Sequence, residues 1–257
     1  FPKVGAAVLL ELGLHNPLAA ALGAEGESER VLAKQVLAAQ PAQSLVLKDR
    51  YYGVPLLLVN LPAADERHFL VRAKLNLRRR LLEVYPDGSA LVELRAGAKT
   101  RLVREIVGRV QRGGRGPATL VRLWTSLLDW RRYPAAELLA LYAQRWEQEI
   151  FYKELKGDLR STPCLQSHTP LTALQELAVL ILAAAALVDY RVAAAAVGEV
   201  GVLRISFMKT LQVVQGLWQF LTLAADLLTP AQVRLVVRRG LRRIADMAIP
   251  KRRPRSC

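Results

Sequence analysis

A tyrosine, an arginine, a glutamate and a lysine recur at helical intervals in YAQRWEQEIFYKELK, residues 142–156. On an α-helix each residue advances by about 100°. With Arg145 at zero, Lys156 falls at about 20° and Glu149 at about 40°. Tyr142 falls at about 60°, so all four would share one face. A carboxylate can bind a divalent metal, and the cations can bind phosphate. The alternative is a solvated face with an ordinary i,i+4 pair between Arg145 and Glu149, worth a few tenths of a kcal/mol.

A second carboxylate, Asp49, ends the short apolar run SLVLKDR, which predicts a buried strand. Carboxylates at a strand end and on a helix face are the parts of a divalent-metal site for phosphoryl transfer. The net charge of +15 favours an acidic polymer as partner, which can be DNA, RNA or an anionic membrane surface. Composition alone does not choose among these three partners.

The first third of the chain must position Asp49, and it alternates strand-like and helix-like segments. Residues 3–12 and 17–24 predict two antiparallel strands, and 27–40 predicts a helix with Ser28 as N-cap. Residues 44–50 and 68–74 predict further strands. This order indicates an α/β layer.

The middle of the chain changes character. Two β-prone runs flank Pro86-Asp87-Gly88, which is typical of a hairpin turn. We therefore expect a small basic β-rich insertion from about residue 74 to 126. The glycine-rich stretch 113–117 is predicted to be a loop without phosphate-binding spacing.

From residue 134 onward the pattern is helical. Residues 134–159 predict one long helix, and 169–196 predict a nearly all-apolar helix in the core. Residues 206–228 and 229–248 predict two more helices, the second with a basic face. The basic tail Lys251–Arg255 is expected to attract DNA non-specifically.

At the helical signature the sequence resembles a known family. The pattern Tyr142, two residues, Arg145, three residues, Glu149, six residues, Lys156 is similar to the YREK signature of insertion-sequence transposases of the IS-4 group. The segments LVLKDRYYG, RLWTSLLDWRRYPAAELLALYAQRWEQEIFYKELK and LRSTPCLQSHTPLTALQELAVLILAAAAL also resemble segments of that family. These are DDE enzymes, named for three catalytic acids.

The resemblance implies an α/β, RNase H-like (retroviral-integrase-type) core. A β-rich insertion would separate the second and third catalytic acids, and the C-terminal part would be helical. Residues 1–73 would form the N-terminal part of the core and 74–126 the insertion. Residues 127–257 would supply the catalytic helix and the C-terminal helices.

The resemblance also implies roles for individual residues. Asp49 and Glu149 would be the second and third acids and would hold Mg²⁺ or Mn²⁺. In a two-metal site one ion activates the nucleophile and the other stabilises the leaving oxygen. Tyr142, Arg145 and Lys156 would contact DNA phosphates near the scissile bond.

Trp146 follows Arg145 at about 100° on the same helical projection. By resemblance it would stack on an unpaired base near the cut. An equal alternative is that Trp146 packs against the β-rich insertion.

The function implied is a DNA transposase catalytic domain that cleaves and transfers strands at insertion-sequence ends. Its partners would be double-stranded transposon and target DNA, bound as a homodimer. The family's first Asp precedes the segment that FPKVGAAVLLELG resembles, so we expect an N-terminally truncated chain. The alternative function is a catalytically inactive remnant that only binds nucleic acid.

Other features point to a soluble, cytoplasmic protein that associates with the nucleoid through DNA and not with a membrane. The longest apolar run, Leu177–Val188, has 12 residues, whereas a membrane span needs roughly 20. Cys164 and Cys257 show no ligand or disulfide spacing and are expected to be free thiols.

Three further features are possible functional groups. His15, His68 and His168 lack ligand spacing and are predicted to be surface or loop residues. The run Arg78–Arg80 would either grip DNA phosphates or be a solvated charge run. Asp129 is predicted to be a loop or cap residue rather than a metal ligand.

Overall fold

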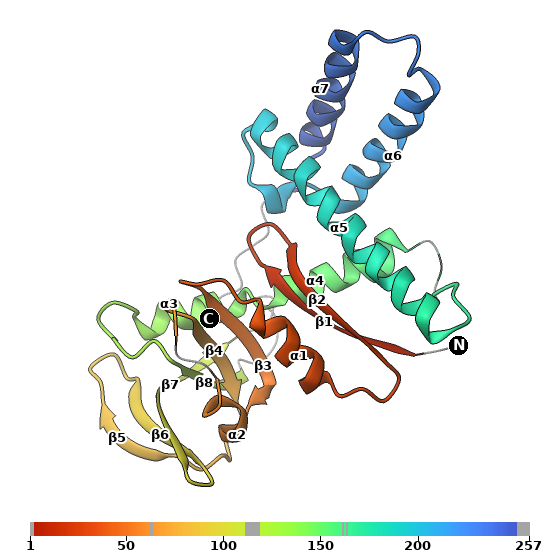
Figure 1. Cartoon of the computed structure of the whole chain (residues 1–257). Helices are drawn as coiled ribbons and strands as arrows, with labels where there is room; N and C mark the ends of the chain where they lie inside the picture. Colours follow the sequence, from red (N-terminus) through yellow and green to blue (C-terminus); the bar gives the residue numbers. More distant parts are fainter. Residues whose placement is uncertain (1–2, 62–63, 111–118, 161, 163, 251–257) are drawn as a thin grey trace. The chain divides into compact units, whose positions relative to one another are not determined.

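The computed structural model describes residues 3–61, 64–110, 119–160, 162 and 164–250 (Figure 1). Within this part the chain divides into two compact units. Unit 1 contains residues 3–39 and 147–250, and unit 2 contains residues 40–146. The division into a core, an insertion and a C-terminal part stays a prediction.

The first element of unit 1 is a two-stranded antiparallel sheet, as predicted. Strand β1 (Val4–Glu11) pairs with β2 (Asn16–Ala24). Successive side chains point to opposite sides, and both faces are apolar because nearly all residues of the two strands are apolar. Ala7 and Ala21 pack on helix α1 (Glu29–Ala38), whereas Val8 joins the core formed with the later helices. The Ser28 hydroxyl accepts the Arg30 N–H at 3.3 Å, which confirms the predicted N-cap.

Unit 1 is completed by helical segments from Glu147 onward, the first of which begins with the last residue of unit 2. Their bounds are α4 (Trp146–Lys153), α5 (Pro170–Gly198), α6 (Phe207–Leu223) and α7 (Pro230–Asp246), with a π-helix η1 (Glu154–Leu159) and a short 3₁₀ turn η2 (Val202–Arg204). Phe151, Leu155, Ile181 and Ile244 lie in one buried cluster with Val8. Figure 1 shows α6 and α7 side by side at the end of α5. Gly240 of α7 permits this close packing, because a Cβ there would lie 2.5 Å from Leu217.

Helix α5 is longer than the uninterrupted apolar run from which the sequence predicted that no segment spans a membrane. It has 29 residues and contains a window of mean hydropathy 2.2, of which 28% is buried. By length and composition it is able to cross a membrane, a test that core helices of soluble proteins also pass. Within unit 1 it contributes Ile181, Ala184 and Leu187 to the core that contains β1 and α7. The absence of a membrane partner stays a prediction.

Unit 2 is built on a six-stranded mixed sheet with the order β3-β4-β8-β7-β6-β5. The strands are β3 (Leu45–Gly53), β4 (His68–Ala73), β5 (Arg80–Val84), β6 (Ala90–Ala96), β7 (Lys99–Val110) and β8 (Thr119–Thr125). Strands β3 and β4 are parallel, and the other neighbours are antiparallel. The predicted hairpin is confirmed between β5 and β6, where Gly88 adopts a φ of 79°. The predicted loop 113–117 lies outside the described residues.

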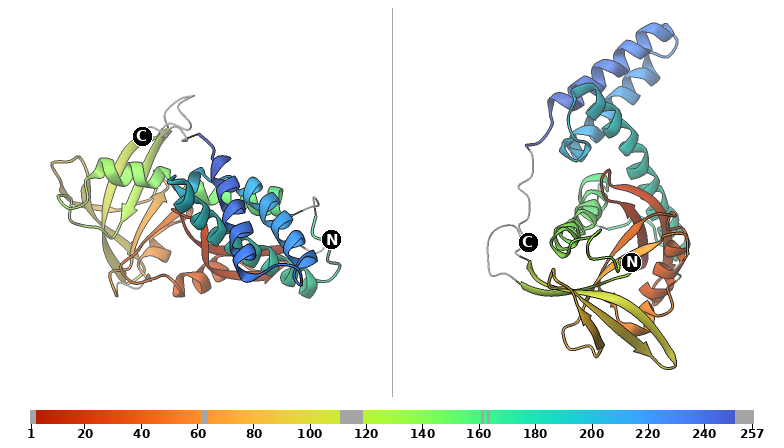
Figure 2. Two further views of the ribbon diagram at one scale, coloured as in Figure 1. Left: turned by 90° about the horizontal axis from the view of Figure 1, so that it is seen from above. Right: turned by 90° about the vertical axis from the view of Figure 1, so that its left-hand side faces the viewer.

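Each face of this sheet is covered. Helix α3 (Ala135–Ala143) packs on one face against Leu70, Ile106 and Leu123, and Figure 2 shows this helix lying beside the sheet. The other face buries Phe69 and Trp124 together with the short helix α2 (Pro55–Leu58). The mixed α/β class is therefore confirmed, whereas the RNase H-like topology stays a prediction.

Buried charges in this sheet were not predicted. The Glu105 carboxylate is 6% exposed and accepts hydrogen bonds from Arg79 Nε at 3.0 Å and Trp124 Nε1 at 3.0 Å. Arg122 Nε lies 3.2 Å from the same carboxylate. Arg104 is fully buried and donates to Asp87. Arg79 is thus held by an ion pair inside unit 2 rather than lying in a simple solvated charge run.

The predicted single helix over residues 134–159 is wrong. Helix α3 ends at Ala143, α4 begins at Trp146, and the π-helix η1 begins at Glu154. Gln144 N–H donates to Leu141 O and Arg145 N–H to Tyr142 O, so each bond spans three residues instead of four. This tightening interrupts the helix. The common angular scale used for the four signature residues therefore does not extend across residues 144–145.

Candidate active site

Asp49 lies in strand β3, which continues past it to Gly53. Pairing with β4 runs from Leu45 to Lys48 and resumes only at Gly53, so Asp49 sits where the ladder is interrupted. Its side chain is exposed, and its Oδ1 accepts the Tyr51 N–H at 2.8 Å. An exposed carboxylate at an irregular strand position is accessible to a ligand. Gly53 must be small, because a Cβ there would lie 1.9 Å from the Arg72 carbonyl oxygen.

Tyr142 brings the end of α3 next to this carboxylate. The ring is 7% exposed, and its hydroxyl donates to the Lys48 carbonyl oxygen at 3.2 Å. Burial raises the pKa of Tyr142, whereas the positive charges of Arg145 and Arg72 lower it and the charge of Asp49 raises it further. Arg145 also hydrogen-bonds the Tyr142 side chain. Asp49, Tyr142 and Arg145 therefore lie together in unit 2, although Asp49 is far from the other two in sequence.

The remaining signature residues belong to the helical segment of unit 1. Glu149 is half-buried in α4, and Lys156 is exposed within η1. The Lys156 Nζ lies 5.6 Å from the centroid of the Tyr152 ring. Trp146 is half-buried and is the last residue of unit 2 in this part of the chain. Which of these groups contact DNA stays a prediction.

A hollow of about 310 Å³ opens at the carboxyl ends of β3 and β4 in unit 2. The cations Arg50, Arg72 and Lys74 line it together with Ala73, Leu75, Asn76 and Leu120, and no acid does. Carboxyl ends of parallel strands are common places for ligands. Guanidinium and ammonium groups without a nearby acid suit an anion such as phosphate. Arg72, which lines this hollow, also lowers the pKa of Tyr142 through its positive charge.

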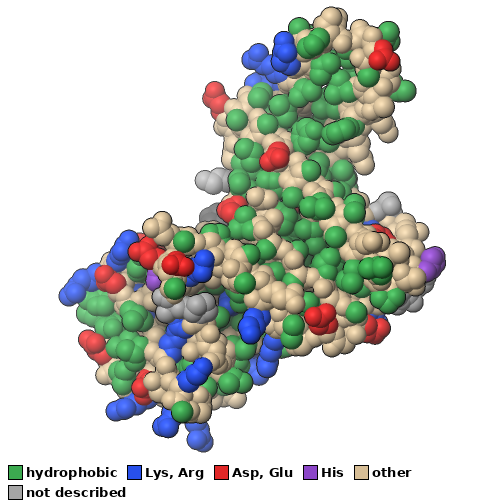
Figure 3. All heavy atoms as spheres, in the orientation of Figure 1, with side chains coloured by type: hydrophobic (Ala, Val, Ile, Leu, Met, Phe, Trp, Pro, Cys, Tyr) green, Lys and Arg blue, Asp and Glu red, His purple; other side chains and the backbone are tan. Residues whose placement is uncertain are grey.

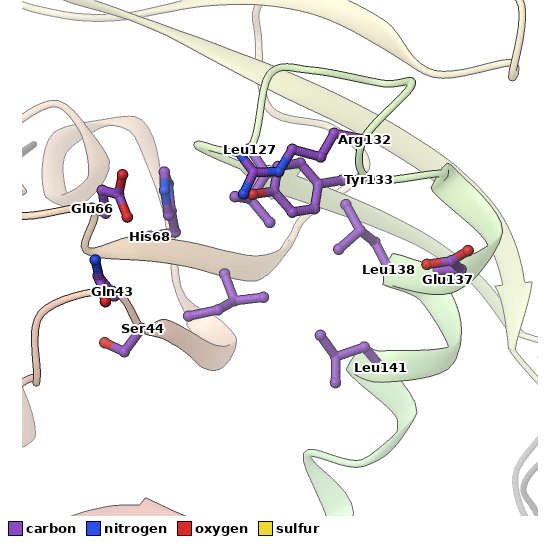
Figure 4. Close-up of a pocket in the computed structure, with 11 residues that line it drawn as sticks. Gln43, Ser44, Glu66, His68, Leu127, Arg132, Tyr133, Glu137, Leu138 and Leu141 are labelled. Atoms are coloured by element: carbon purple, nitrogen blue, oxygen red, sulfur yellow. The ribbon is translucent and has the colours of Figure 1, made fainter.

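A larger cavity of about 720 Å³ lies elsewhere in unit 2 (Figure 4). Gln43, Ser44, Glu66 and His68 face residues 132–141 across it, as Figure 4 shows. It contains two carboxylates and none of the predicted site residues. This cavity is therefore separate from the candidate active site.

The sequence predicts Asp49 and Glu149 as metal ligands. No group of three or more His, Cys, Asp or Glu side chains that could hold a metal ion occurs among the described residues. The exposed carboxylate of Asp49 and the half-buried carboxylate of Glu149 are nevertheless oxygen donors of the type that Mg²⁺ and Mn²⁺ prefer. That these two carboxylates bind a metal ion stays a prediction.

The histidines follow the sequence prediction only in part. His168 is exposed as predicted, and His68 is half-buried with Nδ1 3.2 Å from Ser126 Oγ. His15 contradicts the prediction, because it is 1% exposed and contacts Glu147 and Glu154. Spacing could not reveal this cluster, since His15 lies more than a hundred residues before its partners in sequence.

Two smaller predictions are confirmed. Asp129 is an exposed loop residue whose Oδ1 accepts the N–H groups of Arg131 at 2.9 Å and Arg132 at 3.2 Å. Cys164 is a free, exposed thiol. Cys257 and the basic tail lie outside the described residues.

Comparison with known proteins agrees with the resemblance in the sequence. Residues 3–185 match the family model described as the transposase DDE domain. Over 193 residues the chain is 32% identical to the transposase InsG for insertion sequence element IS4 of Escherichia coli strain K12. That similarity covers 71% of this chain and 43% of the relative, so the chain spans less than half of the relative's length.

Proposed function

Because the chain belongs to the transposase DDE-domain family, we propose that it is a DNA transposase catalytic domain. Its reaction would be metal-dependent phosphoryl transfer, which cleaves and joins strands at insertion-sequence ends. The observation that carries this proposal is the convergence of Asp49, Tyr142 and Arg145 in unit 2. The hollow lined by three cations supports it, since a DNA substrate presents phosphates.

The proposed metal ligands are Asp49 and Glu149. A bound Mg²⁺ or Mn²⁺ would supply activation of the attacking oxygen and charge stabilisation of the leaving oxygen. Asp49 is suited to this role because its carboxylate is exposed, with one oxygen fixed by the Tyr51 N–H. This bond orients the carboxylate before a ligand arrives.

The proposed phosphate contacts are Arg145 and Lys156. Arg145 is oriented by its hydrogen bond with the Tyr142 side chain, and the Tyr142 hydroxyl is itself engaged with the β3 backbone. Tyr142 would therefore act by holding Arg145 next to Asp49 as well as by any phosphate contact of its own. Trp146 is proposed to stack on an unpaired base near the cut.

A second basic surface supports DNA as the substrate. Helix α7 carries five exposed arginines, at positions 234, 238, 239, 242 and 243. Its other side packs into unit 1 through Gly240, Ile244 and Ala245. Figure 3 shows Lys and Arg side chains gathered over the α7 end of this unit. We propose that this face of α7 contacts the DNA backbone. We also propose that the catalytic core has an RNase H-like architecture. The protein would act as a homodimer on double-stranded DNA.

The test of the active site is cleavage of supercoiled plasmid DNA in Mn²⁺ by the full chain, together with Mn²⁺ binding followed by electron paramagnetic resonance. Asp49→Asn is expected to lower both by at least about 100-fold, because a carboxylate ligand is lost. Asp129→Asn is a closely matched control. Both aspartates are exposed in unit 2, and both accept a backbone N–H from the residue two positions on.

The alternative function, a remnant that binds nucleic acid without cleaving it, makes a different prediction. Wild type would then shift DNA in a gel without nicking it, and Asp49→Asn would change neither property. Equal losses in Asp49→Asn and Asp129→Asn would contradict the assignment of Asp49 as a ligand.

A further inference from the structure

His15 occupies an unusual place at the tip of the β1–β2 hairpin. It is 1% exposed and adopts a φ of 60°, in the left-handed region that non-glycine residues rarely occupy. This conformation costs on the order of 1 kcal/mol, so the surroundings must hold it in place. The turn before it is fixed by Glu11, whose carboxylate accepts the N–H groups of Gly13 and Leu14, both at 2.7 Å.

Both ring nitrogens of His15 face carboxylates. Nδ1 lies 2.9 Å from Glu154 Oε2, and Nε2 lies 2.9 Å from Glu147 Oε2. A neutral imidazole has one N–H, so its other nitrogen would turn a lone pair towards a carboxylate. Only the doubly protonated ring can donate to both partners. Burial lowers the pKa of His15, but the hydrogen bonds to Glu147 and Glu154 outweigh it and raise the pKa above 6.5.

The charges in this cluster balance when His15 is protonated. Arg191 of α5 is 2% exposed, and its Nη1 lies 3.9 Å from Glu154 Oε2. Two cations then face two carboxylates. Loss of the His15 proton would leave a net negative charge in a buried place, which is costly. The groups around the ring come from α4, η1 and α5, with Glu11 at the hairpin end.

The position of this cluster relates it to the signature residues. Glu147 and Glu154 face the same side of the segment, because both carboxylates contact the His15 ring. Glu149 is about 200° away from Glu147 on α4. Glu154 is the first residue of η1, the π-helix that contains Lys156. His15 therefore contacts the side of α4 that is opposite to Glu149.

We propose that His15 is a positioning residue whose imidazolium ties α4 and η1 to the hairpin and so fixes Glu149 and Lys156 for phosphate chemistry. The positioning part rests on the proposed function of those two residues. The tie itself concerns only contacts inside unit 1, so it is tested separately from DNA binding and cleavage.

The first measurement is hydrogen exchange in the full chain. His15→Asn keeps a residue that tolerates positive φ but is too short to reach both carboxylates. Amides of residues 147–159 are expected to exchange at least about tenfold faster, because two charge-assisted hydrogen bonds are lost. His68→Asn, which removes a half-buried histidine of unit 2, should leave these amides unchanged. Unchanged exchange in a folded His15→Asn chain would overturn the proposal.

Two further measurements keep the proposal testable if His15→Asn fails to fold. In the wild type, ¹⁵N NMR should find both His15 ring nitrogens protonated at pH 7.5, where a free imidazole is mostly neutral. A neutral His15 would refute the tie. The triple change His15→Asn, Glu147→Gln, Glu154→Gln removes the uncompensated carboxylates and should restore folding. Failure of this rescue would contradict the charge argument.

The positioning role is read from a double-mutant cycle on DNA affinity. Lys156→Gln should weaken DNA binding in the wild type and weaken it less in the His15→Asn background, because Lys156 is no longer held in place. Equal losses in both backgrounds would reduce His15 to a structural residue. If wild type does not bind DNA at all, the proposed function fails, whereas the exchange and NMR results still decide the tie.

Discussion

Replacing Lys48 by methionine should stabilise the protein. Lys48 lies on β3, is 7% exposed, and has its Nζ 6.0 Å from the centroid of the Tyr52 ring. Burial, with a smaller contribution from the charge of Arg101, lowers the pKa of Lys48 from 10.5 to about 8. A charged amine in this apolar place costs free energy that methionine, of similar shape, does not.

The magnitude follows from the pKa shift. Each pKa unit corresponds to about 1.4 kcal/mol, so a shift from 10.5 to about 8 amounts to about 3 kcal/mol. A lowered folded pKa means that the unfolded chain binds this proton more tightly. The cost is therefore fully present below pH 8, and it is relieved as the pH rises from about 8 to about 10.5. Lys48→Met should gain up to about 3 kcal/mol at pH 7 and lose the pH-dependent rise.

Urea unfolding followed by tryptophan fluorescence measures this change in unit 2 alone. Trp218 is the only tryptophan outside unit 2, so a Trp218→Phe background leaves three reporters in the right unit. Lys74→Met, at an exposed lysine of the same unit, is the control. The reasoning is refuted if Lys48→Met is no more stable than Lys74→Met at pH 7, or if its stability still rises between pH 8 and 10.5.

Three other perturbations test different parts of the structure. Glu105→Gln should lower the free energy of unfolding of unit 2 by about 3 kcal/mol, measured in urea, since two arginines lose a buried partner. Gly53→Ala should lower the thermal midpoint because its Cβ would meet backbone of the adjacent strand at 1.9 Å, whereas Gly157→Ala has open space and should not. Arg238→Gln with Arg239→Gln should reduce the slope of log affinity against log salt by up to about 2 in DNA titrations. An unchanged slope would remove α7 from the DNA-binding surface.

The regular elements could be predicted because their sequence signals are local. The hairpin β1–β2 follows from two short apolar runs, and α1 follows from Ser28 and the periodic apolar residues after it. The β5–β6 hairpin follows from Pro-Asp-Gly. These signals depend on neighbours within a few residues, so tertiary contacts did not overturn them.

The buried charges could not be predicted because their partners are distant in sequence. Glu105 is satisfied by Arg79 and by two residues of β8, and His15 by glutamates of α4 and η1. A charged residue in a sequence is normally expected at the surface. Only the fold shows that a group of opposite charge lies next to each of these side chains. That partner offsets part of the cost of burying a charged group.

The sequence predicted helical structure at the signature residues, but it did not predict that the helix is interrupted. A helical wheel drawn through residues 142–156 assumes that every backbone N–H donates to the carbonyl oxygen four residues earlier. The bonds from Gln144 and Arg145 span three residues, and the segment from Glu154 is a π-helix. Either change rotates the residues beyond it relative to those before it. The shared stripe was therefore a product of ideal geometry, and the match of its four residues to the family signature stays a prediction.

The interruption at residues 144–145 gives the signature two separate supports. Tyr142 and Arg145 are held by unit 2, where the Tyr142 hydroxyl is bonded to the β3 backbone beside Asp49. Glu149 and Lys156 are carried by unit 1, on the segment that His15 contacts. A substitution that loosens one support should therefore leave the other half ordered. Hydrogen exchange can test this directly: Tyr142→Phe should speed exchange near β3 and the end of α3 and leave residues 147–159 as protected as in the wild type. Faster exchange in both halves would show that the two supports act as one.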